Sequence, residues 1–186
     1  MVKERGLDPR RLDVRAFAGA GGSLGGEWPQ SGFTRLADSL MPTPGDSLPP
    51  PATWTASGER RRPAGAAPET WPRLQARCAV TLQCQRCLHP MVEDVVIDRR
   101  LRFVDDEDDA ARLDEESEDD VRVASRNLDL HELLEDELIL ALPLVPRHDV
   151  CPQPLPTGAD GGEAAEEAQP NPFAALAALR RPPPPR

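Results

Sequence analysis

Two short motifs carry the residues of this sequence that are best suited to chemistry. Cys84 and Cys87 form a C-x2-C pair, and His148 and Cys151 form an H-x2-C pair after sixty intervening residues. Two thiolates on one tight turn face a common point, and a second pair of donors can complete a tetrahedron around a metal ion. The pattern therefore predicts a four-ligand metal site, for which zinc is the candidate cofactor.

The C-x2-C pair has two other interpretations, which are thiol redox chemistry and unligated thiols. A redox pair stands where a strand enters a helix, because the helix N-terminus stabilises the nucleophilic thiolate. Here an alternating segment at 74–82 leads into the pair and a β-rich segment at 92–104 follows it, which predicts a hairpin with the cysteines at its tip. A metal-binding knuckle suits this setting better, although Leu88 occupies the place of the glycine that often follows such knuckles. Metal binding and unligated thiols both remain open.

The elements that would position these residues form an α+β domain. Apolar residues occupy every second position of the first strand, at Leu74, Ala76, Cys78, Val80 and Leu82. Cys78 lies on this apolar face and is expected to be a core residue. The predicted fold is an antiparallel β-sheet built around the C-x2-C hairpin and packed against one amphipathic helix, with flexible loops and a C-terminal tail.

The helix is expected at 129–142, directly before the H-x2-C pair. Asp129 is a suitable N-cap with Glu132 three positions later, and Pro143 ends the helix. Its leucines recur at helical spacing and form one apolar face.

Polar residues of this helix are assigned by their position relative to the leucines. The carboxylates on the opposite face are expected to be solvated, and they are Glu132, Glu135 and Asp136. His131 is likewise expected to be polar surface. Glu137 lies nearer the apolar stripe, and we hypothesise that it bonds Arg86 or Arg100.

The remaining segments give weaker patterns. Residues 12–18 alternate between apolar and polar, which predicts a short strand. Residues 33–40 are compatible with two turns of helix, and the prolines that follow predict a loop to about residue 68. Residues 121–124 are expected to return briefly to the sheet.

The net charge of -10 is located in one segment, because 105–120 holds eleven carboxylates against Arg112 alone. So many like charges repel one another, which predicts an extended, solvated acidic loop. The rest of the chain is electrically balanced.

A single domain is expected over 10–151, followed by a flexible tether at 152–170 and a short amphipathic helix at 171–180. The charged start is followed by no apolar segment, and nowhere do about 18 consecutive apolar residues occur. We therefore expect a cytoplasmic protein with reduced thiols and no membrane contact.

Four arginines of the hairpin are candidates for contact with nucleic-acid phosphates. They are Arg86, Arg99, Arg100 and Arg102. The alternative is that they are ordinary solvated arginines, because basic residues are dispersed and form no stripe with interleaved aromatic residues.

Three blocks of the sequence resemble the YceD family, the large ribosomal RNA subunit accumulation proteins. They are CQRCL at 84–88, LDLHELLEDELILALPLVPRH at 128–148 continuing to Cys151, and NPFAALAAL at 171–179. The resemblance implies a bacterial cytosolic factor for the synthesis, processing or stability of large-subunit (23S) ribosomal RNA, with no established enzymatic activity. Its expected partners are precursor ribosomal RNA or ribosomal proteins, and no small-molecule substrate is expected.

Two other classes of function are compatible with the residues. One is a zinc- or thiol-dependent enzyme, either a nuclease or an oxidoreductase. The other is a protein-interaction adaptor unrelated to RNA. The sequence shows no nucleophile paired with a base and no phosphate-binding glycine loop after a strand, which argues against catalysis.

Overall fold

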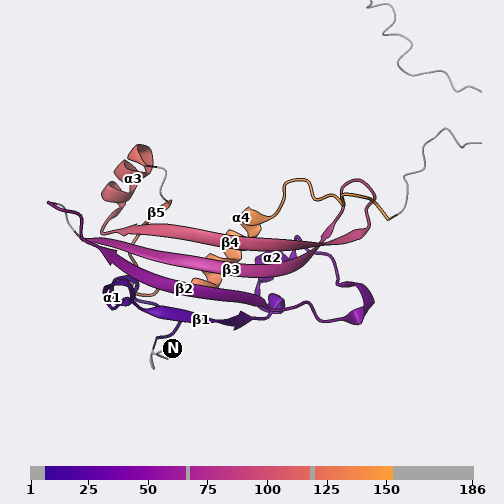
Figure 1. Ribbon diagram of the computed structural model, residues 1–186, viewed down its shortest axis with the longest axis horizontal. Coiled ribbons are helices and arrows are strands. Elements are labelled where there is room, and N and C mark those ends of the chain that lie inside the picture. Colours follow the sequence, from indigo (N-terminus) through magenta and orange to yellow (C-terminus); the bar gives the residue numbers. More distant parts are fainter. Residues whose placement is uncertain (1–6, 66–67, 118–119, 153–186) are drawn as a thin grey trace, which may run out of the picture. The chain divides into compact units, whose positions relative to one another are not determined.

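The computed structural model describes residues 7–65, 68–117 and 120–152. Five strands form one sheet in the order β1-β2-β3-β4-β5 (Figure 1). The strands β1 to β4 are antiparallel to their neighbours, whereas β5 runs parallel to β4. The bounds are Ser23–Trp28 for β1, Ala52–Arg61 for β2, Glu69–Gln83 for β3, Pro90–Val104 for β4 and Asp120–Val123 for β5.

The hairpin of β3 and β4 is the longest pairing of the sheet. Cys78 lies opposite Val95 and Ala76 lies opposite Ile97, and all four side chains are buried. Cys78 is 1% exposed and belongs to the core, as predicted, and this burial raises the pKa of its thiol to about 11. The strands predicted at 74–82 and 92–104 are confirmed. The observed strands are longer, because β3 spans Glu69–Gln83 and β4 begins at Pro90.

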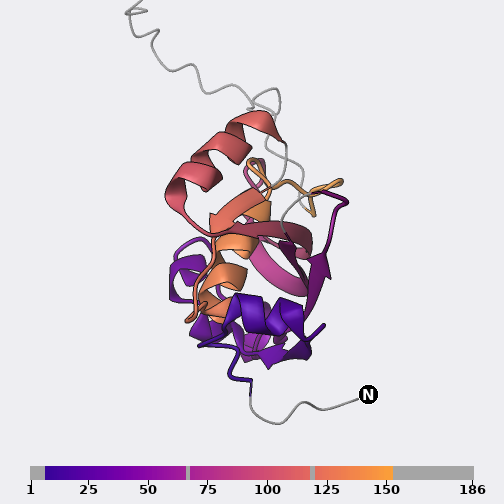
Figure 2. The same cartoon turned by 90° about the vertical axis from the view of Figure 1, so that its left-hand side faces the viewer.

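Four α-helices accompany the sheet in the part of the chain that the structure describes. Their bounds are Val14–Gly19 for α1, Thr34–Ala37 for α2, Glu107–Glu116 for α3 and Leu130–Ala141 for α4. Two 3-10 turns, η1 at Gln30–Gly32 and η2 at Pro44–Asp46, complete the elements. In Figure 1 the sheet lies in front of α4, and Figure 2 shows this pair from the side.

The fold class α+β is confirmed, but two details of the prediction are not. The sheet is mixed rather than antiparallel throughout, because the chain passes through α3 between β4 and β5 and returns in the same direction. Four α-helices are described rather than one amphipathic helix. The described residues up to Cys151 form one compact unit.

The helix α4 carries the apolar face that the sequence predicted. Asp129 caps it by accepting hydrogen bonds from the backbone amides of His131 and Glu132. Its leucines Leu130, Leu133, Leu134 and Leu138 are buried in the core. Helix and cap therefore agree with the prediction for 129–142.

Two polar residues of α4 are buried, contrary to the prediction that they face solvent. His131 is 5% exposed and stacks on Phe33 at 4.5 Å between ring centroids. Glu135 is also 5% exposed and binds the N-terminus of α2 through Arg35 and Leu36. The segment around α2 covers these two positions of α4, whereas Glu132 is exposed as predicted and Asp136 is half-buried.

The buried Glu137 pairs with different arginines from those hypothesised. Its carboxylate accepts from Arg99 at 3.0 Å and from Arg122 at 3.4 Å. Neighbouring residues of a strand point to opposite faces, so Arg99 of β4 reaches α4 and Arg100 does not. Arg86 lies at the far hairpin tip.

The predicted strand at 12–18 is wrong, because this segment forms α1. Asp13 caps the helix by accepting from the backbone amide of Ala16 at 2.9 Å. Val14, Phe17 and Ala18 are buried, and this i, i+3, i+4 spacing belongs to a helix face.

The loop expected after the helical turns at 33–40, up to about residue 68, contains strand β2. Ala52, Trp54 and Ala56 alternate along β2 and are buried. These positions have the period of a strand, but two of the three are small alanines between proline-rich stretches. The predicted helical turns at 33–40 are observed in part, as the single turn of α2.

The acidic segment is a helix, not the extended loop expected for 105–120. Asp106 caps α3 by accepting from the backbone amide of Asp109, and the first-turn carboxylates face the positive end of the helix dipole. Arg112 pairs with Asp109 and with Glu116 at i,i+3 and i,i+4 spacing. These local contacts offset the repulsion. The predicted return of 121–124 to the sheet is confirmed by β5.

The tether at 152–170 and the helix at 171–180 lie outside the described residues apart from Pro152. Among the residues that are described, no helix is both long enough and apolar enough to span a bilayer.

Candidate metal centre

The turn between β3 and β4 positions Cys84 and Cys87. The strand β3 ends at Gln83 and β4 begins at Pro90. The turn is closed by two backbone hydrogen bonds, from Cys84 to the His89 carbonyl at 3.0 Å and from Leu88 to the Cys84 carbonyl at 2.9 Å. Leu88 has a φ of 62°, so a leucine adopts the left-handed conformation that favours glycine.

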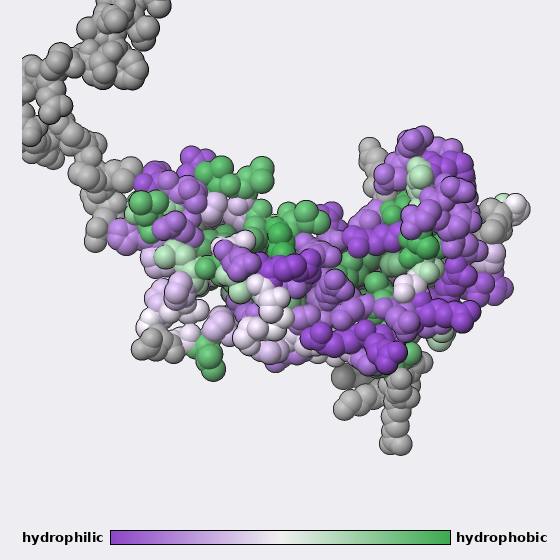
Figure 3. Space-filling model, turned by 180° about the vertical axis from the view of Figure 1, so that it is seen from behind, coloured by the Kyte–Doolittle hydropathy of each residue, from purple (hydrophilic) through white to green (hydrophobic). Residues whose placement is uncertain are grey.

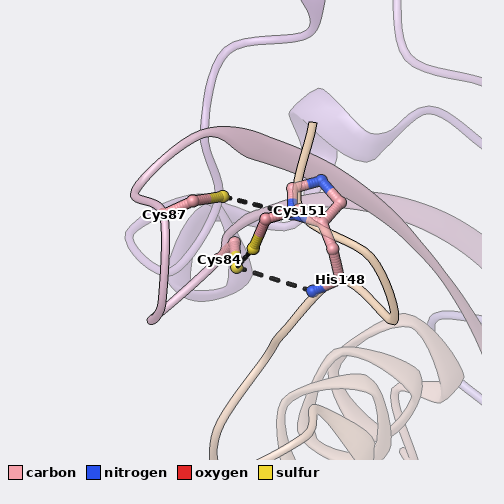
Figure 4. A group of neighbouring side chains, drawn as sticks. All are labelled: Cys84, Cys87, His148 and Cys151. Atoms are coloured by element: carbon pink, nitrogen blue, oxygen red, sulfur yellow. Dashed lines mark hydrogen bonds between the residues drawn. The ribbon is translucent and has the colours of Figure 1, made fainter. Parts of the chain in front are cut away.

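The segment after α4 brings His148 and Cys151 to the same place. Proline at 143 and 146 prevents the helix from continuing, and the chain runs back towards the hairpin tip. The backbone amide of Gln85 donates to the Pro146 carbonyl at 2.8 Å, which joins this segment to the C-x2-C turn. Figure 4 shows the two pairs of side chains converging from these two segments.

The distances between the four side chains fit one metal ion. The sulfurs of Cys84 and Cys151 are 4.0 Å apart, and the Cys87 sulfur lies 3.4 Å from Nδ1 of His148. All four ligand atoms lie within 4.8 Å of one another. Tetrahedral zinc with Zn–S bonds of about 2.3 Å needs sulfur–sulfur separations of about 3.8 Å. The predicted quartet is therefore brought together in a geometry that can hold a metal.

The first thiol of the quartet is buried and surrounded by amide donors. Burial raises the pKa of Cys84, but hydrogen bonds from the backbone amides of Cys87, His148 and Arg86 outweigh it and bring the pKa to about 5. The thiolate is the form that binds a metal. Burial and the neighbouring thiols raise the pKa of Cys87, which is the expected effect of placing several thiols in one site.

Arg86 lies within the C-x2-C turn, and its guanidinium crosses to the other half of the site. Its Nε donates to the Cys151 sulfur at 3.0 Å, and its Nη2 donates to the carbonyl of His148 at 2.6 Å and of Asp149 at 3.3 Å. The contact with Cys151 raises the pKa of Arg86 above its usual value. Arg86 is a component of the site that spacing alone did not reveal, although its place between the two cysteines was a signal.

The four arginines proposed to contact RNA do not form one cluster. Arg86 is at the hairpin tip, whereas Arg99, Arg100 and Arg102 lie near the other end of β4. Arg99 pairs with Glu137, and Arg102 pairs with Glu69 at 2.7 Å. Contact of these residues with RNA stays a prediction.

Exposed hydrophobic side chains lie close in sequence to the four candidate ligands. Leu88, Leu144, Val145 and Val150 are 63%, 100%, 54% and 85% exposed. Figure 3, which views the molecule from behind, shows hydrophobic surface on its left half, the end that carries the hairpin tip. Apolar surface gathered in one region indicates contact with another macromolecule.

Comparisons with known proteins cover the part of the chain that carries this site. A family model described as "Large ribosomal RNA subunit accumulation protein YceD" matches residues 73–180. A protein of that name from Haemophilus influenzae is 38% identical over 107 residues, which cover 55% of this chain and 60% of the relative. The chain thus spans about 60% of the length of that curated relative. No solved structure matches the chain.

Proposed function

Because the chain belongs to the YceD family of large ribosomal RNA subunit accumulation proteins, we propose that it is a non-catalytic factor for the synthesis, processing or stability of 23S ribosomal RNA. The observation that carries this proposal is the family match over 73–180, which includes the hairpin, α4 and the whole metal centre. The partners in this role are precursor ribosomal RNA or ribosomal proteins. The role would place the protein in the cytoplasm.

The geometry of the metal centre supports a non-catalytic role. Structural zinc sites use four protein ligands, whereas catalytic sites keep one position for water or substrate. Here four side chains, Cys84, Cys87, His148 and Cys151, converge on one point and would fill a tetrahedron. This argues against a zinc-dependent nuclease.

The proposed role is tested by depleting the protein from its host and measuring the ratio of 23S to 16S ribosomal RNA. We expect 23S RNA to fall while 16S RNA is kept, with recovery when the full chain is supplied. An unchanged ratio would overturn the proposal. Purified protein that degrades precursor RNA, with loss of this activity in Cys84→Ser, would instead indicate the enzyme.

We also propose that the quartet binds zinc. Three thiolates and one imidazole form a soft donor set, which suits zinc and few other abundant metal ions. The ion would join the β3–β4 turn to the segment after α4, which are also connected by the hydrogen bond of Gln85 with Pro146.

The zinc proposal is tested by measuring metal per chain after purification under reducing conditions. We expect close to one zinc in the wild type and a large loss in Cys84→Ser, Cys151→Ser and His148→Ala. Cys78→Ala is the matched control, because Cys78 is a buried cysteine outside the quartet, and it should keep the metal. A wild type without metal would leave the cysteines as unligated thiols.

A protein partner in the ribosome is favoured by two surfaces. The helix α3 has no buried residue and begins with three carboxylates, and the hydrophobic side chains close in sequence to the candidate ligands are exposed. Acidic surface attracts basic ribosomal proteins. Co-sedimentation with large-subunit precursors that survives nuclease treatment, and fails when 107–116 is replaced by a neutral linker, would support this route over direct RNA contact.

A further inference from the structure

The side chain of Arg86 connects the two halves of the metal centre. Its backbone belongs to the turn that carries Cys84 and Cys87, while its guanidinium donates hydrogen bonds to Cys151, His148 and Asp149 of the opposite segment. One side chain thus contacts the sulfur of one ligand and the backbone carbonyl of another. A residue placed to meet RNA phosphates would direct these donors outward instead.

The charge of the centre explains why a cation is needed there. Zinc bound by three thiolates and one neutral imidazole has a formal net charge of -1. Cys84 is completely buried, so water does not screen this charge fully. A guanidinium whose Nε lies 3.0 Å from the Cys151 sulfur supplies the opposite charge.

The geometry also explains why the cation is arginine. The planar guanidinium presents several N–H groups in a fixed fork, which is suited to a sulfur and two carbonyl groups at once. Lysine carries one compact ammonium on a flexible stem and does not reproduce this fork.

We propose that Arg86 is the positioning residue of the metal centre, which neutralises the zinc-bound thiolates and holds the His148–Cys151 segment against the C-x2-C turn. This rests on the zinc site proposed above. Contacts around the ligands orient them, and their removal weakens metal binding by about 10- to 100-fold. Arg86 then serves the metal and not the RNA.

The test compares Arg86→Gln and Arg86→Lys with the wild type and with Arg147→Gln. Arg147 lies in the same segment, and the structure shows for it neither a hydrogen bond nor an ion pair within the described residues, so it is the matched control. Zinc affinity is measured by competition with a chromophoric chelator, and the ligand field by the visible spectrum of the Co²⁺-substituted protein. We expect zinc affinity to fall about 10- to 100-fold in Arg86→Gln, with a shifted thiolate-to-cobalt band, and little rescue by Arg86→Lys. Arg147→Gln should match the wild type.

The outcomes separate this inference from the zinc proposal. Zinc affinity of Arg86→Gln within about two-fold of the wild type, with an unchanged cobalt spectrum, would overturn the role of Arg86 and leave the zinc site in place. A wild type that binds neither metal would overturn both. A zinc-loaded Arg86→Gln protein that no longer co-sediments with large-subunit precursors, while Arg147→Gln does, would return Arg86 to the RNA-contacting surface and overturn the inference.

Discussion

The carboxylate of Glu135 on α4 caps the N-terminus of α2, 100 residues earlier in the chain. It accepts hydrogen bonds from the backbone amides of Arg35 at 2.6 Å and Leu36 at 3.1 Å, and from the Arg35 guanidinium at 3.1 Å. Burial raises the pKa of Glu135, but these donors outweigh it and hold the pKa below its usual value. The interaction fixes α2 against α4, the helix that packs on the sheet.

Replacing Glu135 by alanine should therefore destabilise the fold. The change leaves two amides of a helix end without their acceptor, and we expect the free energy of unfolding to fall by about 1–3 kcal/mol. Urea denaturation monitored by circular dichroism measures it. Glu132→Ala removes an exposed carboxylate from the same helix and should change stability by less than about 0.5 kcal/mol. Equal effects of the two substitutions would contradict the capping role.

The buried imidazole of His131 should make stability depend on pH. Burial lowers the pKa of His131, and the nearby Arg10 adds to this effect. The unfolded chain then binds the proton more readily than the folded protein, so the stability contributed by neutral His131 is complete above a pH of about 6.5 and is lost as pH falls through the folded-state pKa.

We expect His131→Phe to flatten this acid-side loss. The aromatic ring keeps the stacking against Phe33 and the T-shaped contact with Trp28, but carries no proton. The measurement is the free energy of unfolding of both proteins between pH of about 5 and 7. All other side chains are common to both proteins, so their contributions cancel in the difference. Parallel curves would show that His131 does not titrate differently on folding.

Adjacent arginines of β4 should differ sharply in their contribution to stability. Arg99 pairs with Glu137, which is 2% exposed, whereas Arg100 points to the opposite face. Arg99→Gln weakens the compensation of a buried carboxylate, and we expect it to lower the free energy of unfolding by about 1–3 kcal/mol. Arg100→Gln should cost less than about 0.5 kcal/mol. A thermal or urea melt of both variants measures this difference in stability. If Arg99→Gln lowers the stability as little as Arg100→Gln, Glu137 relies on Arg122 rather than on Arg99.

The helix α3 should depend on its cap more than on tertiary packing. None of its residues is buried. The cap at Asp106 and the ion pairs of Arg112 with Asp109 and Glu116 therefore provide most of its stability. Asp106→Ala should speed amide exchange across 107–116 by roughly 5-fold or more, which corresponds to about 1 kcal/mol, while global stability changes little. Asp114→Ala, at the other end of the helix, removes an unfavourable charge and should slow exchange.

Local patterns were sufficient for the parts of the fold that define the metal centre. The alternation at 74–82, the cap at Asp129 and the two ligand pairs are all set by neighbours in the sequence. Their convergence in space depends on the return of the chain to the hairpin tip after Pro143, a non-local contact made by the hydrogen bond from Gln85 to Pro146.

The errors arose where distant contacts or competing local patterns decide. His131 and Glu135 look solvated because the segment that covers them comes from around residue 35. Residues 12–18 fit a period of two and a helical period alike, and the cap at Asp13 selects the helix. In the acidic segment, the prediction considered only the number of like charges. It overlooked that Arg112 can pair with Asp109 and Glu116 on the same face of a helix.

Leu88 occupies the left-handed position of the C-x2-C turn, with a φ of 62° and a side chain that is 63% exposed. Such a conformation costs a residue with a Cβ about 1–2 kcal/mol and costs glycine almost nothing. Leu88→Gly should therefore raise the free energy of unfolding of the metal-loaded protein by about 1 kcal/mol after allowance for the freedom of glycine in the unfolded chain. The β-branched Leu88→Val should lower it, because branching makes this conformation worse.

Both variants should keep the metal stoichiometry of the wild type, since the amide of residue 88 still donates to the Cys84 carbonyl. Urea melts at fixed zinc concentration provide the comparison. A gain of stability in Leu88→Gly together with weaker co-sedimentation with large-subunit precursors would mean that the exposed leucine is kept for a partner at the expense of the fold. A loss of stability in Leu88→Gly would mean that the leucine side chain packs on its own domain strongly enough to outweigh the strain of the turn.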